Sequence, residues 1–311
     1  MAKLLELRER IRAVENIQTI TRTLATVAAA RLARARRRAA GLRVYARSIR
    51  EILHRQQTHL ARAGDAGDAA LSFLQGRRPV RNVVLFVLTS DRGMCGGYNL
   101  DLCRCALAFW EERKKAHQRV AFVLKGRKGA RYLSRLGAEI LHQEGWRREL
   151  IGAVDVERLL GVLVAPYRSR AAEEVHVAYT DFRSPIHRGP RVVRLFPIEL
   201  LPGQEEPPGK AERWFYEPFA RAVLDELVAV YIRAQLCDVL LESYASEQGA
   251  RMITMEEATE RADRTLQECR AQHNRLRRET VTTDLLGALF ASRAAKGAGT
   301  YTGKAGSRRR P

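Results

Sequence analysis

The two ends of this chain lack proline over long stretches, and this constrains the fold more than any other feature of the sequence. The first proline is Pro79, and between Phe219 and about Lys296 there is again none. Proline breaks a helix because it has no amide donor and its ring clashes with the preceding turn. Each end of the chain is therefore able to form one long helix.

Apolar residues repeat along both ends in the alternating steps of three and four that are typical of a coiled-coil seam. In the N-terminal stretch these apolar residues form two groups: Leu4, Leu7, Ile11, Val14, and then Ile17, Ile20, Leu24, Val27. The step from Val14 to Ile17 is three where four is expected, which predicts a shift of register. The C-terminal stretch alternates strictly through Met252, Met255, Thr259, Ala262, Leu266, Cys269, His273 and Leu276. The simplest arrangement is an antiparallel coiled coil, and on pattern alone a structural brace or a dimerisation stalk also fits.

The middle of the chain has a different pattern. Continuous apolar runs such as NVVLFVLT, VAFVL, EVHVAYT and RVVRLFPI alternate with helical ones, which indicates βαβ units and a mainly parallel sheet. The predicted fold is therefore α/β, with a long antiparallel coiled coil of the terminal helices around a central domain. The expected segments are an N-terminal coiled-coil helix (1–76), the central α/β domain (77–202), a linker (203–218), a C-terminal coiled-coil helix (219–296) and a flexible basic tail (297–311).

The formal net charge of +20 predicts a partner that is acidic, such as nucleic acid, anionic lipid or an acidic protein. The five cysteines form no C-x-x-C pair, so a zinc ribbon or a disulfide framework is not indicated. No apolar window is long enough to span a membrane, and Glu6, Glu9 and Glu15 are atypical of a signal or transit peptide. We therefore expect a chain that is cytoplasmic or on a cytoplasmic face.

Three separated parts of the sequence resemble the gamma subunit of rotary F-type ATP synthases, in the same order along the chain. The N-terminal part is IRAVENIQTITRTLATVAAARLARAR, and the central part is SDRGMCGGYN. The C-terminal blocks are WFYEP, SYASEQGARMITMEEATERAD and NRLRRETVTTDLL. The resemblance covers nearly the whole chain, and the fold that it implies agrees with the one predicted from the residue pattern.

The resemblance implies that the chain is a central rotor shaft and not itself an enzyme. In such complexes the paired terminal helices pass through a ring of alternating alpha and beta subunits, and catalysis takes place on the beta subunits. The α/β domain lies beside an epsilon subunit and a ring of membrane c subunits. The implied partners are thus the alpha, beta and epsilon subunits and the c-ring, at the cytoplasmic face of a prokaryotic cell membrane, with no cofactor, no metal and no direct membrane span.

The turn after the first apolar strand, SDRGMCGGYN, raises the question of an active site, because it is rich in glycine and contains a cysteine. It matches neither the dinucleotide-binding fingerprint nor the P-loop, and no histidine is nearby in the sequence to activate the thiol. Glycines at a strand–helix junction allow positive φ and close backbone packing without any ligand. We therefore interpret these residues as a structural turn: Gly93, Cys95, Gly96 and Gly97.

The resemblance also implies which parts of the C-terminal helix contact the surrounding subunits. Met252 and Met255 belong to the part that runs inside the ring, although seam packing explains them equally well. Arg277, Thr282 and Asp284 match positions of polar contact with the ring, whereas Arg278 stands where the family usually has glutamine. The alternative for all four is an ordinary solvated helix face. The apolar shaft tip is expected at Leu285, Leu286, Leu289 and Phe290, which otherwise cap the coiled coil.

The basic run from Arg31 to Arg38 has two interpretations. In a shaft, Arg31 and Arg34 face acidic lever segments of the beta subunits, and many weak charge contacts slide there without locking. In the alternative, the chain is an arginine-rich coiled-coil protein that binds nucleic acid. Base-stacking aromatic residues are absent from the run and Tyr45 stands alone, which favours the shaft.

Several features depart from the commonest members of the family. ITRTLATVAAA replaces the usual methionine-containing stretch, and the tail after Lys296 runs past the usual end. These departures point to a divergent branch, such as the alternate F-type complexes that some prokaryotes have beside a standard enzyme. The sequence leaves open whether the ion is H⁺ or Na⁺ and whether synthesis or hydrolysis of ATP dominates.

Overall fold

A computed structural model gives the fold of the chain and describes residues 2–63, 72–146, 151–182, 184, 188–198, 217 and 220–299. The elements are α1 (Ala2–Ala63), β1 (Asn82–Leu88), α3 (Tyr98–Lys115), β2 (Arg119–Lys125), α4 (Arg127–Ser134), β3 (Glu139–Glu144), α5 (Ala153–Arg168), β4 (Glu174–Phe182), β5 (Arg188–Phe196) and α6 (Ala220–Gly299). The predicted linker, apart from Glu217, and residues 300–311 of the predicted tail lie outside the described residues. Among the described helices, none is long and apolar enough to cross a membrane.

The chain forms two compact units. One consists of Met1–Thr23 and Glu256–Pro311, and the other of Leu24–Met255. The first unit contains the beginning of α1 and the C-terminal part of α6. The second contains the sheet and the remaining parts of both long helices.

The sheet of the second unit has the strand order β3-β2-β1-β4-β5. Among the described strands, the pairs of β1 with β2, β1 with β4 and β2 with β3 are parallel, and the pair of β4 with β5 is antiparallel. The predicted α/β fold is confirmed: the sheet is mainly parallel, and one long helix precedes it and another follows it along the chain. The strand β3 was not predicted, because its side chains alternate between exposed and half-buried and include Glu139, His142 and Gln143.

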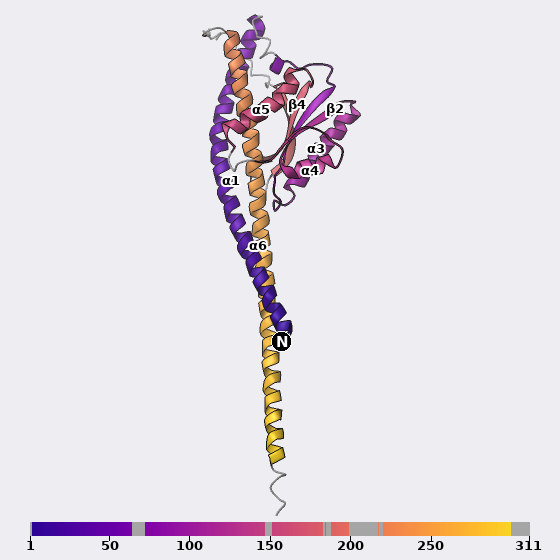
Figure 1. Cartoon of the computed structure of the whole chain (residues 1–311). Helices are drawn as coiled ribbons and strands as arrows, with labels where there is room; N and C mark the ends of the chain where they lie inside the picture. The colour runs from indigo at the N-terminus through magenta and orange to yellow at the C-terminus, as the bar shows by residue number, and fades with distance from the viewer. Residues whose placement is uncertain are drawn as a thin grey trace, which may run out of the picture. The chain divides into compact units, whose positions relative to one another are not determined.

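Both faces of the sheet are covered, which explains the continuous apolar run of β1. Val83, Leu85 and Val87 pack on the side of α3 and α4, with Leu102, Ala106, Ala130 and Leu133. The intervening strand residues pack on the other side, against α5, α1 and α6. Figure 1 shows α3 and α4 on one side of the sheet and α5 and α6 on the other. The sheet is therefore fixed to α6 through a large apolar core.

Candidate functional site

The first unit is an antiparallel pair of helices, as predicted. The residue number on α6 falls as the number on α1 rises: Arg8 bonds to His273, Glu15 pairs with Arg270, Gln18 bonds to Asp263, and Thr21 bonds to Thr259. The predicted seam of α6 is confirmed here, because Ala262, Leu266 and Cys269 are buried. Thr259, His273 and Leu276 are half-buried.

The seam of α1 corrects the second half of its prediction. Ile17, Ile20 and Val27 are 51%, 58% and 38% exposed, and Leu24 is half-buried. The buried side of α1 continues from Val14 without a shift of register, through Gln18, Thr21, Ala25, Ala28, Leu32, Ala35 and Ala39. The prediction was wrong because it followed only large apolar residues. Alanines let two helices approach closely, and the polar seam residues Gln18 and Thr21 have hydrogen-bond partners on α6.

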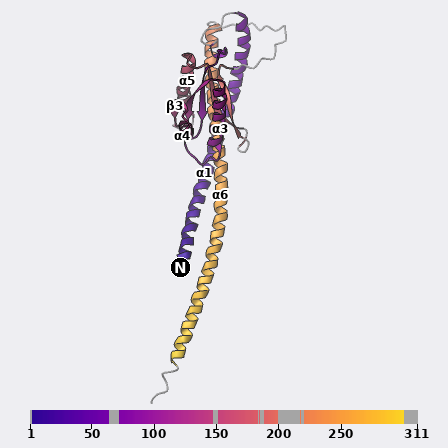
Figure 2. The same ribbon diagram turned by 90° about the vertical axis from the view of Figure 1, so that its right-hand side faces the viewer.

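The C-terminal part of α6 continues past the start of α1. Ala2–Leu7 is all of α1 that precedes Arg8, whereas α6 runs on from His273, the residue bonded to Arg8, to Gly299. Both views show this end of α6 extending beyond the N-terminus (Figure 1, Figure 2). Its apolar side chains are half or more exposed: Val281, Leu285, Leu286, Leu289 and Phe290. The predicted tip residues Leu285, Leu286, Leu289 and Phe290 thus form an exposed apolar surface on the described part of α6, which we call the apolar tip.

The predicted polar contact residues lie on the same stretch of α6. Arg277, Thr282 and Asp284 are exposed. The hydroxyl of Thr282 donates a hydrogen bond to the carbonyl oxygen of Arg278 at 2.9 Å, one turn earlier, so its donor is used within the helix. Arg277 and Asp284 thus lie on the exposed surface of α6.

The remaining predicted contact residues lie in the second unit and differ in exposure: Arg31, Arg34, Met252 and Met255. Arg34 is exposed. Met255 is buried, and Met252 packs beside Leu32 and Tyr244, so for both methionines the packing interpretation describes this structure. Burial raises the pKa of Glu247, and the charges of Arg251 and Arg31 oppose this, which places Arg31 close to a buried carboxyl.

The stretch of α6 from residue 241 to residue 250 is buried on all sides. Small side chains occupy half of it: Ser243, Ala245, Ser246, Gly249 and Ala250. Ser246 donates a hydrogen bond from its hydroxyl to the carbonyl oxygen of Thr180 at 2.8 Å, which joins the helix to β4. A helix enclosed on every side is held by the elements around it, so this stretch fixes the α/β domain to α6.

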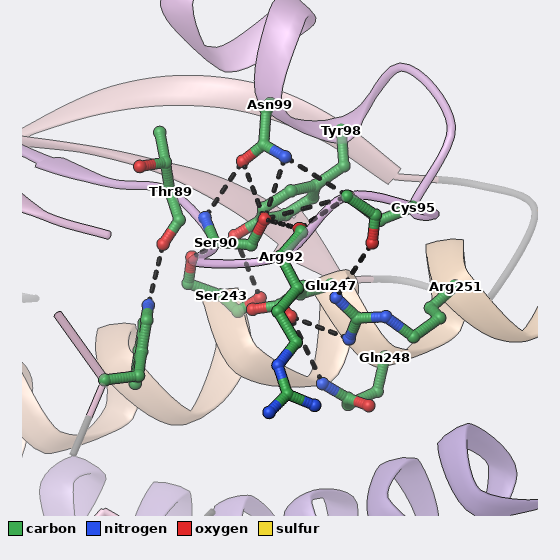
Figure 3. Close-up of polar contacts among 12 residues, drawn as sticks. Thr89, Ser90, Arg92, Cys95, Tyr98, Asn99, Ser243, Glu247, Gln248 and Arg251 are labelled. Carbon is green, nitrogen blue, oxygen red and sulfur yellow. Dashed lines mark hydrogen bonds and ion pairs between the residues drawn. The ribbon is translucent and has the colours of Figure 1, made fainter. Parts of the chain in front are cut away.

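The turn Ser90–Asn99 is one of the elements that enclose α6 (Figure 3). The hydroxyl of Tyr98 lies 2.8 Å from that of Ser243 and donates to the carbonyl oxygen of Leu88 or of Ser243, each 3.2 Å away. Arg251 pairs with Glu247 at 2.7 Å and lies 3.4 Å from the carbonyl oxygen of Gly93. The turn is therefore a docking element for the helix.

Cys95 in this turn has the surroundings of a structural cysteine. Cys95 is 2% exposed, and its thiol lies 3.2 Å from the side-chain amide nitrogen of Asn99, which also donates to the hydroxyl of Ser90 at 2.8 Å. Burial raises the pKa of the thiol, and the hydrogen bond with Ser90 only partly opposes this. Nucleophilic cysteines need the thiolate, so the structure favours the interpretation of the turn as structural.

Gly96 is the glycine of the turn that has a positive φ, as the non-glycine residue Met94 also does. Its φ is +56°, and a Cβ atom there would lie 2.9 Å from the hydroxyl of Thr254 on α6. Gly97 has an ordinary helical φ of −74°, and a Cβ atom added there meets only the flexible carboxyl of Asp101. The two glycines thus provide a matched pair of positions.

We expect Gly96→Val to lower the free energy of unfolding by about 1–3 kcal/mol, because a β-branched residue resists positive φ and meets Thr254. Gly97→Ala should change it by less than about 0.5 kcal/mol. Urea denaturation of the full chain measures both changes.

The resemblance implies a complex that hydrolyses ATP, and in such a complex Cys95→Ser should leave the hydrolysis nearly unchanged. Loss of ATP hydrolysis in an assembled Cys95→Ser complex would show instead that the cysteine takes part in the chemistry.

The C-terminal edge of the parallel strands is where α/β proteins of this kind usually bind a ligand. Here the carboxyl of Asp91 occupies the N-terminus of α4, accepting hydrogen bonds from the amides of Arg127 at 2.9 Å and Trp146 at 2.8 Å. The turn before α4 also packs tightly, since a Cβ atom at Gly126 would lie 2.1 Å from the carbonyl oxygen of Thr89. A cavity of about 540 Å³ lies at the opposite edge, beside Pro79, Glu174 and Pro197. The position that binds an anion in related folds thus holds a side chain of this protein.

Comparison with known proteins places the chain in a family. The family model described as ATP synthase matches residues 3–288. An ATP synthase gamma chain of Sorangium cellulosum (strain So ce56) is 31% identical, covering 95% of this chain and all of the relative. A gamma chain of Geobacter sp. (strain M21) is 33% identical, covering 96% of this chain and all of the relative.

Solved structures show the same fold at lower identity. A chain of the Euglena gracilis mitochondrial ATP synthase (OSCP/F1/c-ring) aligns with a TM-score of 0.61 at 13% identity, covering 99% of both chains. A chain of the Tetrahymena thermophila mitochondrial ATP synthase (central stalk/c-ring) aligns with a TM-score of 0.54 at 17% identity, covering 77% of this chain and 99% of the other. The matches decide between the two functions that the sequence left open and give no support to nucleic-acid binding. The chain belongs to the ATP synthase family, as a gamma chain.

Proposed function

We propose that this gamma chain is the non-catalytic rotating shaft of its ATP synthase, with its apolar tip enclosed by the alpha and beta subunits. The exposure of the apolar tip is the observation that carries this proposal. Leu285, Leu289 and Phe290 are 61%, 63% and 67% exposed at the end of a single helix. A cluster of exposed large apolar side chains marks a surface that another protein covers.

The shaft works by contacting each catalytic subunit differently at each angle. A ligand or partner shifts a conformational equilibrium only by its differential affinity for the two states. Arg277 and Asp284 project from α6 above the apolar tip. On α1, Ile17 and Ile20 face away from the seam. These residues give the shaft an uneven surface, which is what makes three otherwise equal catalytic sites unequal in a fixed order.

The α/β domain serves attachment and not catalysis in this proposal. Asp91 fills the anion position of the fold, which supports nucleotide sites elsewhere, on the beta subunits. The solved relatives include a complex with OSCP, F1 and the c-ring and one of the central stalk with the c-ring. We accordingly place the domain against the epsilon subunit and the c-ring, peripherally at the cytoplasmic face of the cell membrane.

The test measures binding of the full chain to an alpha–beta assembly. The variant Leu285→Gln, Leu286→Gln, Leu289→Gln, Phe290→Gln keeps good helix propensity while removing the apolar surface. We expect binding about tenfold weaker or more, equivalent to about 1.4 kcal/mol. The control, Leu136→Gln, Leu141→Gln, Val154→Gln, changes exposed apolar residues of the α/β domain and should bind normally. Unchanged binding of the tip variant, or ATP hydrolysis by the isolated chain, would contradict the proposal.

A further inference from the structure

The cavity at the edge of the sheet opposite Asp91 is lined by more positive than negative charge. Its volume of about 540 Å³ lies within the range of small-molecule sites, which is roughly 300–1,000 Å³. Among the described residues that line it, the charged ones are Arg77, Arg78, Arg194 and Glu174. Three guanidiniums and one carboxylate leave an excess of two positive charges at the wall of this cavity.

The one carboxylate among these residues already has partners. Its Oε2 atom lies 3.2 Å from the Arg113 guanidinium and 2.8 Å from the His176 ring, and its Oε1 atom lies 3.6 Å from Arg194. Burial raises the pKa of Glu174, but the hydrogen bond with His176 and the charges of Arg113 and Arg194 outweigh it and hold the pKa below its usual range. The neighbouring carboxylate of Glu173 accepts hydrogen bonds from two amides at the start of β1, at 3.0 and 2.7 Å. Because Arg113 neutralises Glu174, the positive charge of the cavity wall is not cancelled.

Arg77 is held in place at the wall of the cavity. Its guanidinium donates a hydrogen bond to the carbonyl oxygen of Tyr167 at 2.6 Å and lies 4.4 Å from the centre of the Tyr167 ring. Burial raises the pKa of the Tyr167 hydroxyl, and the charges of Arg77 and Arg194 both oppose this, so both guanidiniums lie near the same ring. A guanidinium carries five N–H donors in one plane, so the bond to Tyr167 leaves Arg77 able to bind a ligand. A donor that is already fixed loses less conformational freedom when the ligand binds.

We propose that this cavity binds a phosphate group, either that of a free phosphate compound or the headgroup of a phosphomonoester lipid. A phosphate monoester carries about 1.5 to 2 negative charges at pH 7 and has three acceptor oxygens, which matches the excess of two positive charges. A single carboxylate brings half of that charge. Arginine suits phosphate because its planar fork donates two parallel hydrogen bonds. The rest of the cavity has room for the organic part of such a compound, beside Val80, Pro197 and Ile198.

The first test titrates the full chain with inorganic phosphate by isothermal titration calorimetry, in about 0.15 M salt, which screens attraction to the basic surface in general. Arg78→Gln removes one cation of the cavity, and because Arg78 is exposed, urea unfolding should stay unchanged. We expect the dissociation constant for phosphate to rise about tenfold, since a hydrogen bond between charged groups is lost. The matched control, Arg104→Gln, removes the same charge from an exposed position of α3 and should bind phosphate as the parent does.

A second variant tests the cavity without removing an arginine. A Cβ atom at Gly76 would lie 3.8 Å from Pro197, which is an ordinary contact, and both residues line the cavity. Gly76→Glu therefore places a carboxylate beside the arginines, where it competes with phosphate, and the dissociation constant should rise at least about tenfold. Its control, Gly41→Glu, adds the same charge on α1, where a Cβ atom meets nothing within 4 Å, and should bind phosphate as the parent does.

Vesicles distinguish the two sources of the phosphate group. The same chains are floated with phosphatidylcholine vesicles that contain phosphatidic acid, whose headgroup is a phosphomonoester. A lipid ligand is indicated if Arg78→Gln and Gly76→Glu bind these vesicles more weakly than their controls do, and a free compound if the two variants weaken only the binding of inorganic phosphate. The proposal is overturned if neither probe binds the parent, or if either cavity variant binds both probes as its control does.

Discussion

Tying α6 to a beta subunit through a cysteine at position 260 is expected to reduce sustained ATP hydrolysis by at least about tenfold, and reduction of the disulfide should restore it. The catalytic sites stay unequal in a fixed order only while the shaft turns, so a shaft fixed at one angle supports no repeated cycle. Glu260 suits this test because its side chain is 72% exposed. Ala250 and Met255, although within the same helix, are buried.

The control disulfide joins the two helices of the shaft to each other. The hydroxyls of Thr21 and Thr259 lie 2.7 Å apart, so Thr21→Cys with Thr259→Cys should form a bond within one chain. That bond leaves the shaft free to turn, and ATP hydrolysis should remain. Both variants are made in a chain whose five native cysteines are replaced. Full hydrolysis with the Glu260→Cys tether near completion would mean that this chain is not the rotating element.

The second large effect is expected from a buried ion pair within α6, next to the turn. Arg251 and Glu247 lie 2.7 Å apart with side chains only 10% and 8% exposed. Arg251→Met leaves the carboxyl of Glu247 buried without its cation, and removing one partner of a buried pair costs about 3–5 kcal/mol. We expect a loss of this size in the free energy of unfolding, measured in urea. The Arg251 guanidinium also lies 3.4 Å from the carbonyl oxygen of Gly93, so the turn loses a contact as well.

The pH dependence of Arg251→Met distinguishes this cause from lost packing. Burial raises the pKa of Glu247 even with Arg251 present, and removal of the guanidinium raises it further. A carboxyl with a raised pKa stabilises the fold at low pH and loses that contribution as the pH rises. The loss should therefore be larger at pH 8 than at pH 5.5, and Glu247→Gln with Arg251→Met should recover most of it. An equal loss at both pH values would indicate packing instead.

The parts of the fold that could be predicted from the sequence are those in which large apolar residues repeat regularly. Strict alternation on α6 identified the seam at Leu266 and Cys269, and the continuous apolar run of β1 identified a strand buried on both faces. The seam of α1 was misread after Val14, because Ala25 and Ala28 are small and Thr21 is polar, and none of them stands out as a seam residue. Their burial depends on a partner helix that comes close.

The docking of the turn onto α6 could not be predicted for a related reason. Ser243, Ser246, Glu247 and Gln248 have the composition of a solvated helix face, but all four are buried. These side chains can be buried because they have partners. Tyr98 bonds to Ser243, Arg251 pairs with Glu247, and the carbonyl oxygen of Thr180 accepts a hydrogen bond from Ser246. The one signal in the sequence was the block SYASEQGARM, whose polar residues interrupt the apolar pattern of the helix.

The single-helix end of α6 has a mechanical consequence. Where α1 and α6 lie side by side, twisting must shear two backbones and the seam between them, including the Thr21–Thr259 and Glu15–Arg270 contacts. Past the start of α1, only the hydrogen bonds of one helix resist the same twist. The torsional compliance of the shaft is therefore concentrated between about Thr280 and Gly299. Thr282 lies in this compliant segment, so a tether there would let the single helix twist while the paired part of the shaft continued to turn.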